Sequence, residues 1–413
     1  MKTTNNFKAL ALFVLIAASF SACKKDRSVP EVIDEETGKE FKFVRVLVSD
    51  ETASTLTQID PFAAKINTFN TKYPMPSIYG TASGKYATVL YGAQNLVEVF
   101  DSGLLLHDDH VDVDGVAKWA LITANGIKPT HFKSKGRENL IFNDGDGTLS
   151  VGNEADFNVA NAKFKIINAG LLAHHGAMAQ FSNGNYAITA TTAVGKSPTS
   201  VIITDKNGTT VHSAKQEVGT IHGNASDGQN AVFGAFSSAA ATSGGVLVVA
   251  ADGTQKFISN PDGFGAFRLG TILYAEKAKK FIGYAANKGA YLVDVANNKI
   301  TPIYTGTDAF QCKVDYAGNN LLILTLDGKL KIYDLLTGAV KKEGAIIAAV
   351  NAADTYKPVL EATAKYAYVA MPSLGEVHQI NLSDFSKVIK HKVSAKPVRL
   401  TLLGFETSAG HND

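Results

Sequence analysis

The chain has 413 residues and carries 40 Lys and Arg against 38 Asp and Glu, which gives a formal net charge of only +2 at pH 7. This balance argues against a nucleic-acid-binding protein, whose footprint needs clustered basic residues. With Cys23 and Cys312 as the two cysteines, we expect no structural disulfide and no Cys-based metal site, so that a metal site would have to use His and carboxylates.

The N-terminus predicts export. Lys2 and Lys8 precede an apolar run at residues 9–20, which is too short to span a bilayer comfortably. Small residues then lead to Cys23, an arrangement that resembles the lipobox of bacterial lipoproteins. We predict a signal peptide at 1–22, with the lipidated Cys23 opening a polar, disordered tether at 23–40. The alternative is an ordinary signal peptide with an incidental cysteine. The anchor would hold the protein in the bacterial cell envelope, facing the periplasm or the cell surface.

Residues 41–406 are predicted to form one all-β domain, followed by a tail at 407–413. Short runs rich in Val, Ile, Tyr, Phe and Thr alternate with turns of Gly, Asn, Asp and Ser, and long helical periodicities are absent. One strand type recurs in unit after unit, five times shortly after a turn with Gly, at Tyr86–Tyr91, Leu140–Phe142, Tyr186–Thr191, Ala231–Ala235, Phe281–Ala285, Leu321–Leu326 and Tyr366–Ala370. The repeat predicts a stack of four-stranded units.

Eight such units are expected, at a spacing of roughly 40–53 residues, which is close to the period of a β-propeller blade. Stacking blades around an axis buries both faces of each small sheet. The first unit, which starts near Phe43, lacks an innermost strand, and the apolar tail at 396–405 lacks a unit. We therefore predict an eight-bladed propeller whose C-terminal strand joins the N-terminal blade. Seven blades is the main alternative.

A segment rich in His and Asp interrupts the second unit. It runs from His107 to Asp114 and includes His110 and Asp112. Four carboxylates so close together repel one another unless a cation lies among them. This segment is a candidate metal site, with a solvated acidic loop or a Ca²⁺ loop as alternatives, although the spacing is not that of an EF-hand. By topology it lies on the face opposite the starts of the inner strands.

Four further histidines fall at the start of the innermost strand of consecutive units. They are His131, the adjacent pair His174 and His175, and His222. The starts of the inner strands lie on one face of a propeller, so these imidazoles are expected to meet at one mouth of the central channel. Imidazole suits Zn, Cu and Ni alike. Because neighbouring residues of a strand face opposite ways, the pair could ligate together only from a loop before the strand. Polar side chains that line the channel and hold water are the alternative.

These segments resemble, in order and in blade context, the exported zinc metallochaperones called AztD. The matching pieces are the loop 107–114, the run 128–131, the triplet 174–176 and the pair 222–223. The resemblance implies a propeller that holds Zn²⁺ and passes it to the zinc solute-binding protein of an ABC transporter. The chain departs from that pattern in having Asp112 where a further His is expected, and in its lipid anchor.

The sequence thus predicts a non-enzymatic, monomeric zinc-binding protein, with ligands among His107, His110, Asp112, His131, His174, His175 and His222. It would capture zinc, touch the membrane through its lipid only and bind no nucleic acid. A metal-dependent propeller hydrolase is a second reading, with Asp144 as a general base if its loop lies on the histidine face. A surface interaction or scaffold lipoprotein that needs no metal is a third.

Overall fold

The short apolar runs form strands throughout the part of the chain that the computed structural model describes, which is residues 43–107, 110–113 and 115–404. All of these residues belong to the unit Lys39–Asp413. The predicted signal peptide, Cys23, the tether and the tail lie outside the described residues and stay predictions. No helix in the described part is long and apolar enough to cross a membrane.

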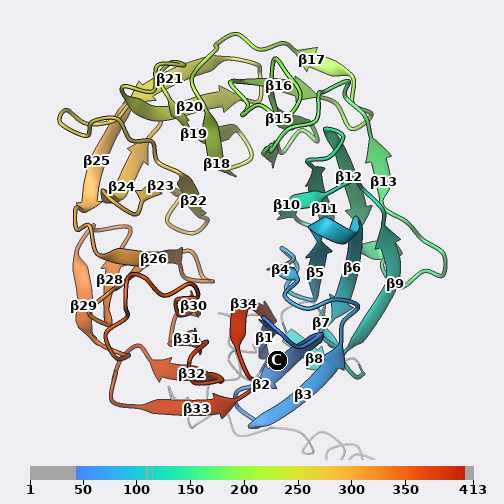
Figure 1. The fold of residues 1–413 in the computed structure, drawn as a ribbon, viewed down its shortest axis with the longest axis vertical. Coiled ribbons are helices and arrows are strands. Elements are labelled where there is room, and N and C mark those ends of the chain that lie inside the picture. Colours follow the sequence, from blue (N-terminus) through green and yellow to red (C-terminus); the bar gives the residue numbers. More distant parts are fainter. Residues whose placement is uncertain (1–42, 108–109, 114, 405–413) are drawn as a thin grey trace, which may run out of the picture. The chain divides into compact units, whose positions relative to one another are not determined.

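The described strands form eight four-stranded antiparallel sheets arranged as the blades of a ring (Figure 1), as the repeat predicted. Blades 1 to 4 contain, from the innermost strand outward, β34 (Pro397–Gly404), β1 (Val44–Asp50), β2 (Thr55–Asp60) and β3 (Lys65–Asn70); β4 (Ser77–Gly80), β5 (Tyr86–Tyr91), β6 (Leu96–Asp101) and β9 (Lys118–Ala124); β10 (Pro129–Lys135), β11 (Glu138–Asn143), β12 (Thr148–Asn153) and β13 (Lys165–Ile167); and β14 (Met178–Gln180), β15 (Tyr186–Ala190), β16 (Ser200–Thr204) and β17 (Thr210–His212).

The second half of the ring repeats the pattern. Blades 5 to 8 contain β18 (Ile221–Ser226), β19 (Asn230–Phe236), β20 (Gly244–Ala250) and β21 (Gln255–Ser259); β22 (Thr271–Ala275), β23 (Lys280–Ala285), β24 (Gly289–Asp294) and β25 (Lys299–Tyr304); β26 (Ala309–Val314), β27 (Asn320–Thr325), β28 (Lys329–Asp334) and β29 (Val340–Ala345); and β30 (Val359–Ala362), β31 (Tyr366–Met371), β32 (Glu376–Asn381) and β33 (Val388–Lys392). Two short 3₁₀ turns, Gly92–Gln94 and Glu154–Asp156, follow β5 and β12.

The core lies between the blades. Ile203 of blade 4, for example, packs in one cluster with Phe233 and Leu247 of blade 5, and all three are fully buried. The second and third strands of each blade are covered by neighbouring blades on both faces, so their sequences read as nearly continuous apolar runs. This burial explains why these strands carried the clearest sequence signal.

Pairing of the two ends of the domain closes the ring. β34 lies antiparallel to β1 from Val44↔Gly404 to Asp50↔Pro397, and it supplies the innermost strand of blade 1. The predicted closure is therefore confirmed. Without β34, β1 would present an unpaired edge to the channel.

The Asp50 carboxylate clamps this junction. Its Oδ1 accepts hydrogen bonds from the Thr52 and Ala53 amides at 2.8 Å each, and its Oδ2 accepts one from the Lys396 amide at 2.6 Å. Burial raises the pKa of the carboxyl, but the hydrogen bonds, led by those from Ala53 and Lys396, outweigh burial and lower the pKa to about 2. One ionised side chain thus joins the end of β1 to the chain that leads into β34.

Replacing this carboxylate should weaken ring closure. Asp50→Asn places an NH₂ group where an N–H needs an acceptor, so we expect it to lower the free energy of unfolding by about 1–3 kcal/mol in urea titrations at pH 7. Asp252→Asn, which alters an exposed turn carboxylate that accepts from the Thr254 amide, is the matched control and should have a smaller effect.

The stability difference between the native protein and Asp50→Asn should depend on pH. The folded pKa of Asp50 is about 2, below the unfolded value of ~3.9, so its contribution is complete well above pH 4 and is lost as the pH falls toward 2. The difference in unfolding free energy between the native protein and Asp50→Asn should therefore shrink between pH 6 and pH 3. A difference that stays constant over this range would contradict the clamp.

Candidate metal centre

Three imidazoles from three consecutive blades meet at the start of the inner strands. His131 lies in β10, His175 in the loop before β14, and His222 in β18. The Nε2 atoms of His131 and His175 are 3.2 Å apart. The ring centroids are 4.6 Å apart for His131 and His175, 5.7 Å for His175 and His222, and 6.3 Å for His131 and His222. The predicted meeting of histidines from blades 3, 4 and 5 is thus present for these three residues.

Local irregularities of the backbone aim these rings. The register of β10 against β11 shifts between Pro129 and His131, and that of β18 against β19 shifts between Ile221 and Asn224. Such bulges turn a side chain away from its regular direction. Gly223 has a φ of +76°, and a Cβ there would lie 2.3 Å from the carbonyl oxygen of Gly270. A glycine is therefore required beside His222.

Hydrogen bonds fix the tautomers of two of the rings. Nδ1 of His175 donates to the Asp144 carboxylate at 2.7 Å, and Nδ1 of His222 donates to the Gly270 carbonyl at 2.9 Å. Each acceptor needs a proton on Nδ1, so in the neutral rings Nε2 carries the lone pair. Metal-ligating histidines characteristically use one ring nitrogen on the metal while the other donates to a carboxylate or carbonyl.

The spacing suits a small cation. Two nitrogens bound at 2.0–2.1 Å to a tetrahedral ion lie about 3.3 Å apart, and the His131 and His175 Nε2 atoms are 3.2 Å apart. In the metal-free chain, the same distance serves a hydrogen bond in which His131 donates to His175. Among the described residues, no group of three or more His, Cys, Asp or Glu side chains is already close enough to hold a metal ion. The rings of His175 and His222 lie farther apart than those of His131 and His175.

The surroundings of His131 favour its neutral form at physiological pH. Burial is the main cause that lowers the pKa of His131 to about 4, and the neighbouring His175, His222 and Lys133 lower it further, while Asp144 opposes them. Burial would raise the pKa of Asp144, but the hydrogen bond with His175, the charge interactions with His175 and His131 and the hydrogen bond with Thr130 together outweigh burial and lower the pKa. A neutral imidazole beside an ionised carboxylate is the protonation state that binds a cation.

His174 does not join this group. It lies in the loop before β14, where the sequence analysis allowed both members of the pair to ligate, but its side chain turns into the blade and is 2% exposed. Its Nδ1 donates to the Leu172 carbonyl at 2.7 Å, and its Nε2 lies 3.2 Å from the hydroxyl of Thr189. Both ring nitrogens are used, so the structure gives His174 a packing role.

The loop with Asp and Gly between β11 and β12 lies on the histidine face, which was the condition set for Asp144 in the sequence analysis. The amides of Asp144 and Gly145 donate to the carbonyls of Lys128 and Ile127 at 3.0 and 2.9 Å. These bonds attach the loop to the chain just before β10 and hold the carboxylate beside His175. The sequence indicated Asp144 as a possible general base. It did not indicate that Asp144 accepts a hydrogen bond from His175, or that the Gly270 carbonyl accepts one from His222.

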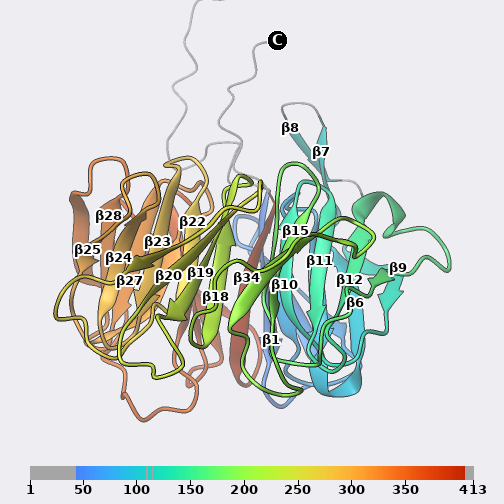
Figure 2. The same ribbon diagram turned by 90° about the horizontal axis from the view of Figure 1, so that it is seen from above.

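The second predicted cluster lies in a hairpin, β7 (Leu104–His107) with β8 (His110–Val113), in which the backbones of His107 and His110 pair. Asp112 pairs with Leu105, and the tip lies outside the described residues. The hairpin follows directly after β6. The end of β6 lies beside the β4–β5 turn, because the amide and hydroxyl of Ser102 both donate to the Lys85 carbonyl. The hairpin projects from the ring in Figure 2, at the end opposite the starts of the inner strands, as predicted.

Comparison with solved structures finds the same architecture elsewhere. Two structures of AztD from Citrobacter koseri, one of them described as apo, superpose with a TM-score of 0.78 at 19% identity, and they cover 89% of this chain and 99% and 100% of theirs. The chain shares its fold with AztD. The dihydro-heme d1 dehydrogenase NirN matches with a TM-score of 0.58 at 14% identity, over 88% of this chain and 75% of its own. No protein-family profile and no curated protein sequence matches. The resemblance to AztD is thus confirmed at the level of the fold.

The electrostatics of the site can be measured in the metal-free protein. We expect the imidazole resonances of His131 to titrate near pH 4, and Asp144→Asn to move this midpoint lower, because the Asp144 charge favours the protonated ring. NMR spectra recorded against pH test both. A His131 midpoint near the ordinary value of ~6.5 would contradict the buried, three-imidazole arrangement.

Proposed function

We propose that this chain is a non-enzymatic zinc-binding protein that holds Zn²⁺ at one mouth of its propeller through His131, His175 and His222. One observation carries the proposal. The Nε2 atoms of two rings face each other at 3.2 Å, and those of His175 and His222 carry lone pairs because Nδ1 is bound to Asp144 and Gly270. Zn²⁺ accepts three imidazoles readily and leaves one position open.

The open position supports transfer rather than storage. Structural zinc sites are closed by four protein ligands, whereas three ligands leave room for water or for a ligand from another protein. The His175 side chain is 49% exposed, so a partner can approach the ion. We propose that the receiver is a zinc solute-binding protein of a transport system, as the resemblance to AztD implies.

We also propose that Cys23 anchors the chain by a lipid to the bacterial envelope, facing the periplasm or the cell surface.

The same geometry disfavours the hydrolase reading. Asp144 is the carboxylate beside the cluster, and it is engaged with Nδ1 of His175 and, more weakly, with the amide of Gly176 at 3.4 Å. A carboxylate that orients a ligand is poorly placed to take a proton from a metal-bound water. Asp144 therefore serves as a positioning residue for His175.

Zinc titration against a competing chelator, with bound metal measured per chain, tests the proposal. The double variant His131→Ala, His222→Ala should weaken binding by roughly 100-fold or more, since it removes ligands rather than their supports. His174→Gln should keep the wild-type affinity for zinc while lowering stability, because both ring nitrogens of His174 are spent inside the blade. Equal losses in the two variants, or wild-type binding weaker than micromolar, would sink the proposal.

The support given by Asp144 can be tested within one loop. Asp144→Ala should weaken zinc binding about 10–100-fold, as is typical when the partner of a ligating histidine is removed. Asp146→Ala is the matched control, because Asp146 accepts from the amide and hydroxyl of Thr148 and touches none of the three rings. Affinity should be unchanged in the control. Equal effects of the two variants would mean a general effect on the loop.

The hairpin is tested separately. Because β7 and β8 lie at the other end of the ring, His107→Ala with His110→Ala should leave the affinity of the three-imidazole site unchanged, whether or not a second ion is lost. Measuring bound zinc per chain in this variant shows whether the hairpin holds a second ion. Loss of all binding would show instead that the hairpin and the mouth make one composite site.

A further inference from the structure

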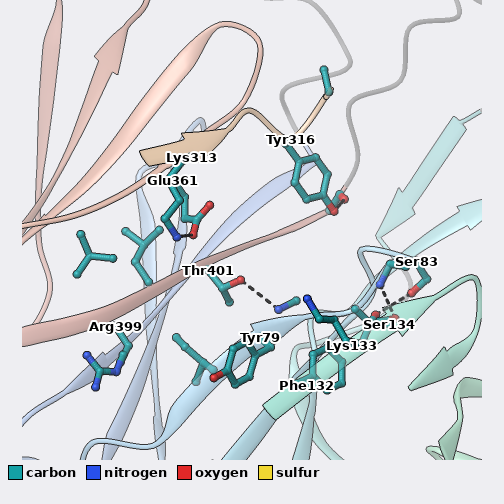
Figure 3. Close-up of a pocket in the computed structure, with 18 of the residues that line it drawn as sticks. Tyr79, Ser83, Phe132, Lys133, Ser134, Lys313, Tyr316, Glu361, Arg399 and Thr401 are labelled. Carbon is teal, nitrogen blue, oxygen red and sulfur yellow. Dashed lines mark hydrogen bonds and ion pairs between the residues drawn. The ribbon is translucent and has the colours of Figure 1, made fainter. Parts of the chain in front are cut away.

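A large cavity lies in the middle of the ring, and no histidine of the described residues lines it. Its volume is about 1130 Å³. The lining comes chiefly from the inner strands β34, β4, β10, β26 and β30, and from the turns that follow them. Figure 3 shows side chains from several blades around this one open space. Blades 1, 2, 3, 6, 7 and 8 supply this lining, and blade 2 supplies the run 77–83. The cavity is therefore a feature shared by several blades.

The charge of this cavity is one-sided. Among the described residues, its lining includes five basic residues, Lys133, Lys277, Lys313, Lys365 and Arg399, and a single acidic one, Glu361. Five positive charges and one negative give a formal lining charge of +4, whereas the whole chain carries only +2. The excess is therefore concentrated on the axis of the ring rather than spread over the surface.

The acidic residue does not neutralise the cavity. Glu361 of β30 pairs with Lys313 of β26 at 2.5 Å, so the charge of this carboxylate is directed at Lys313. Lys133 of β10 donates to the Asn224 carbonyl at 2.7 Å, a neutral acceptor that fixes the ammonium group without cancelling its charge. The Arg399 guanidinium also donates to a neutral acceptor, the Val398 carbonyl, at 3.2 Å.

Neutral donors complete the lining. The hydroxyl of Thr401 accepts from the Gly80 amide at 3.1 Å and keeps its own proton for a further acceptor. Ser83 and Ser134 lie at the same wall, and Tyr79 stacks on Phe132 with ring centroids 5.6 Å apart. Figure 3 labels these groups with Lys133, Lys313 and Arg399 around the same space. Fixed cations and hydroxyls in a concave, partly desolvated space bind oxyanions more strongly than the same groups do in water.

We propose that this cavity binds a small, multiply charged anion whose carboxylate or phosphate groups reach basic residues of different blades. Its size admits a small molecule. The cations come from β10, β26, β34 and the turns after β22 and β30, so that one oxyanion group cannot contact them all. Their place inside the ring favours a compact ligand over an extended polyanion, which would need a stripe of charge on the outer surface. This site is separate from the three imidazoles and does not depend on zinc binding.

Isothermal titration of the metal-free protein at low ionic strength tests this. The probes are citrate, which carries three carboxylates, inorganic pyrophosphate, and uncharged glycerol. We expect saturable 1:1 binding of one of the two anions, weakened by added salt, and no binding of glycerol. Binding of citrate alone identifies a carboxylate ligand, and binding of pyrophosphate alone identifies a phosphate ligand. No saturable binding of either anion would overturn the proposal.

Variants locate the binding within the cavity. Arg399→Gln and, independently, Lys277→Gln should each weaken binding of the anion by about 10-fold, since each removes one charge-assisted contact. Lys277 lies in a turn, which keeps the test valid if Arg399→Gln in β34 disturbs ring closure. Lys165→Gln, at an exposed lysine of blade 3 that bonds to Lys206, is the control and should bind as the native protein does. Equal affinity in all the variants would contradict a site in the cavity.

Discussion

The pairing of β34 with β1 is the contact on which the rest of the ring depends. It joins residues more than 340 positions apart, and the Asp50 carboxylate fixes the junction through amides on both segments. Only a closed ring brings the starts of eight inner strands to one face and leaves a cavity on the axis. The three imidazoles and the basic cavity are thus consequences of closure, although their residues come from blades far from the junction.

The ring places neutral imidazoles and basic side chains in separate regions of its axis. At the mouth, burial and like neighbours keep His131 neutral, and Asp144 and Gly270 leave lone pairs on the Nε2 atoms of its two partners. Further along the axis, Lys133, Lys313 and Arg399 line a space of positive sign. A divalent cation is attracted by the first region and repelled by the second. Under the proposed function, an ion held by the imidazoles would therefore stay at the mouth, where another protein can reach it.

Much of this arrangement was predictable from the sequence, because the repeat fixes both the fold and the place of each residue within a blade. Eight units, closure by the last strand, and the common position of His131, His175 and His222 all follow from the period. The inward orientation of the His174 side chain could not be predicted, because in an irregular loop the local backbone turn decides which of two adjacent side chains faces the channel. The ring of His174 instead hydrogen-bonds the Leu172 carbonyl and the Thr189 hydroxyl. The contacts of Asp144 and Gly270 were also hidden, as was the basic cavity, because its five cations lie on separate blades and no local run of charge reveals them.

The central claim is that three imidazoles from successive blades hold zinc, and X-ray absorption at the zinc edge tests it most directly. The sample is zinc-loaded protein carrying His107→Ala and His110→Ala, so that the hairpin does not contribute. The account predicts three nitrogen neighbours of imidazole type at about 2.0–2.1 Å and one further light atom at the open position. A spectrum with fewer than three imidazoles, or one unchanged when His131 and His222 are replaced by Ala, would contradict it.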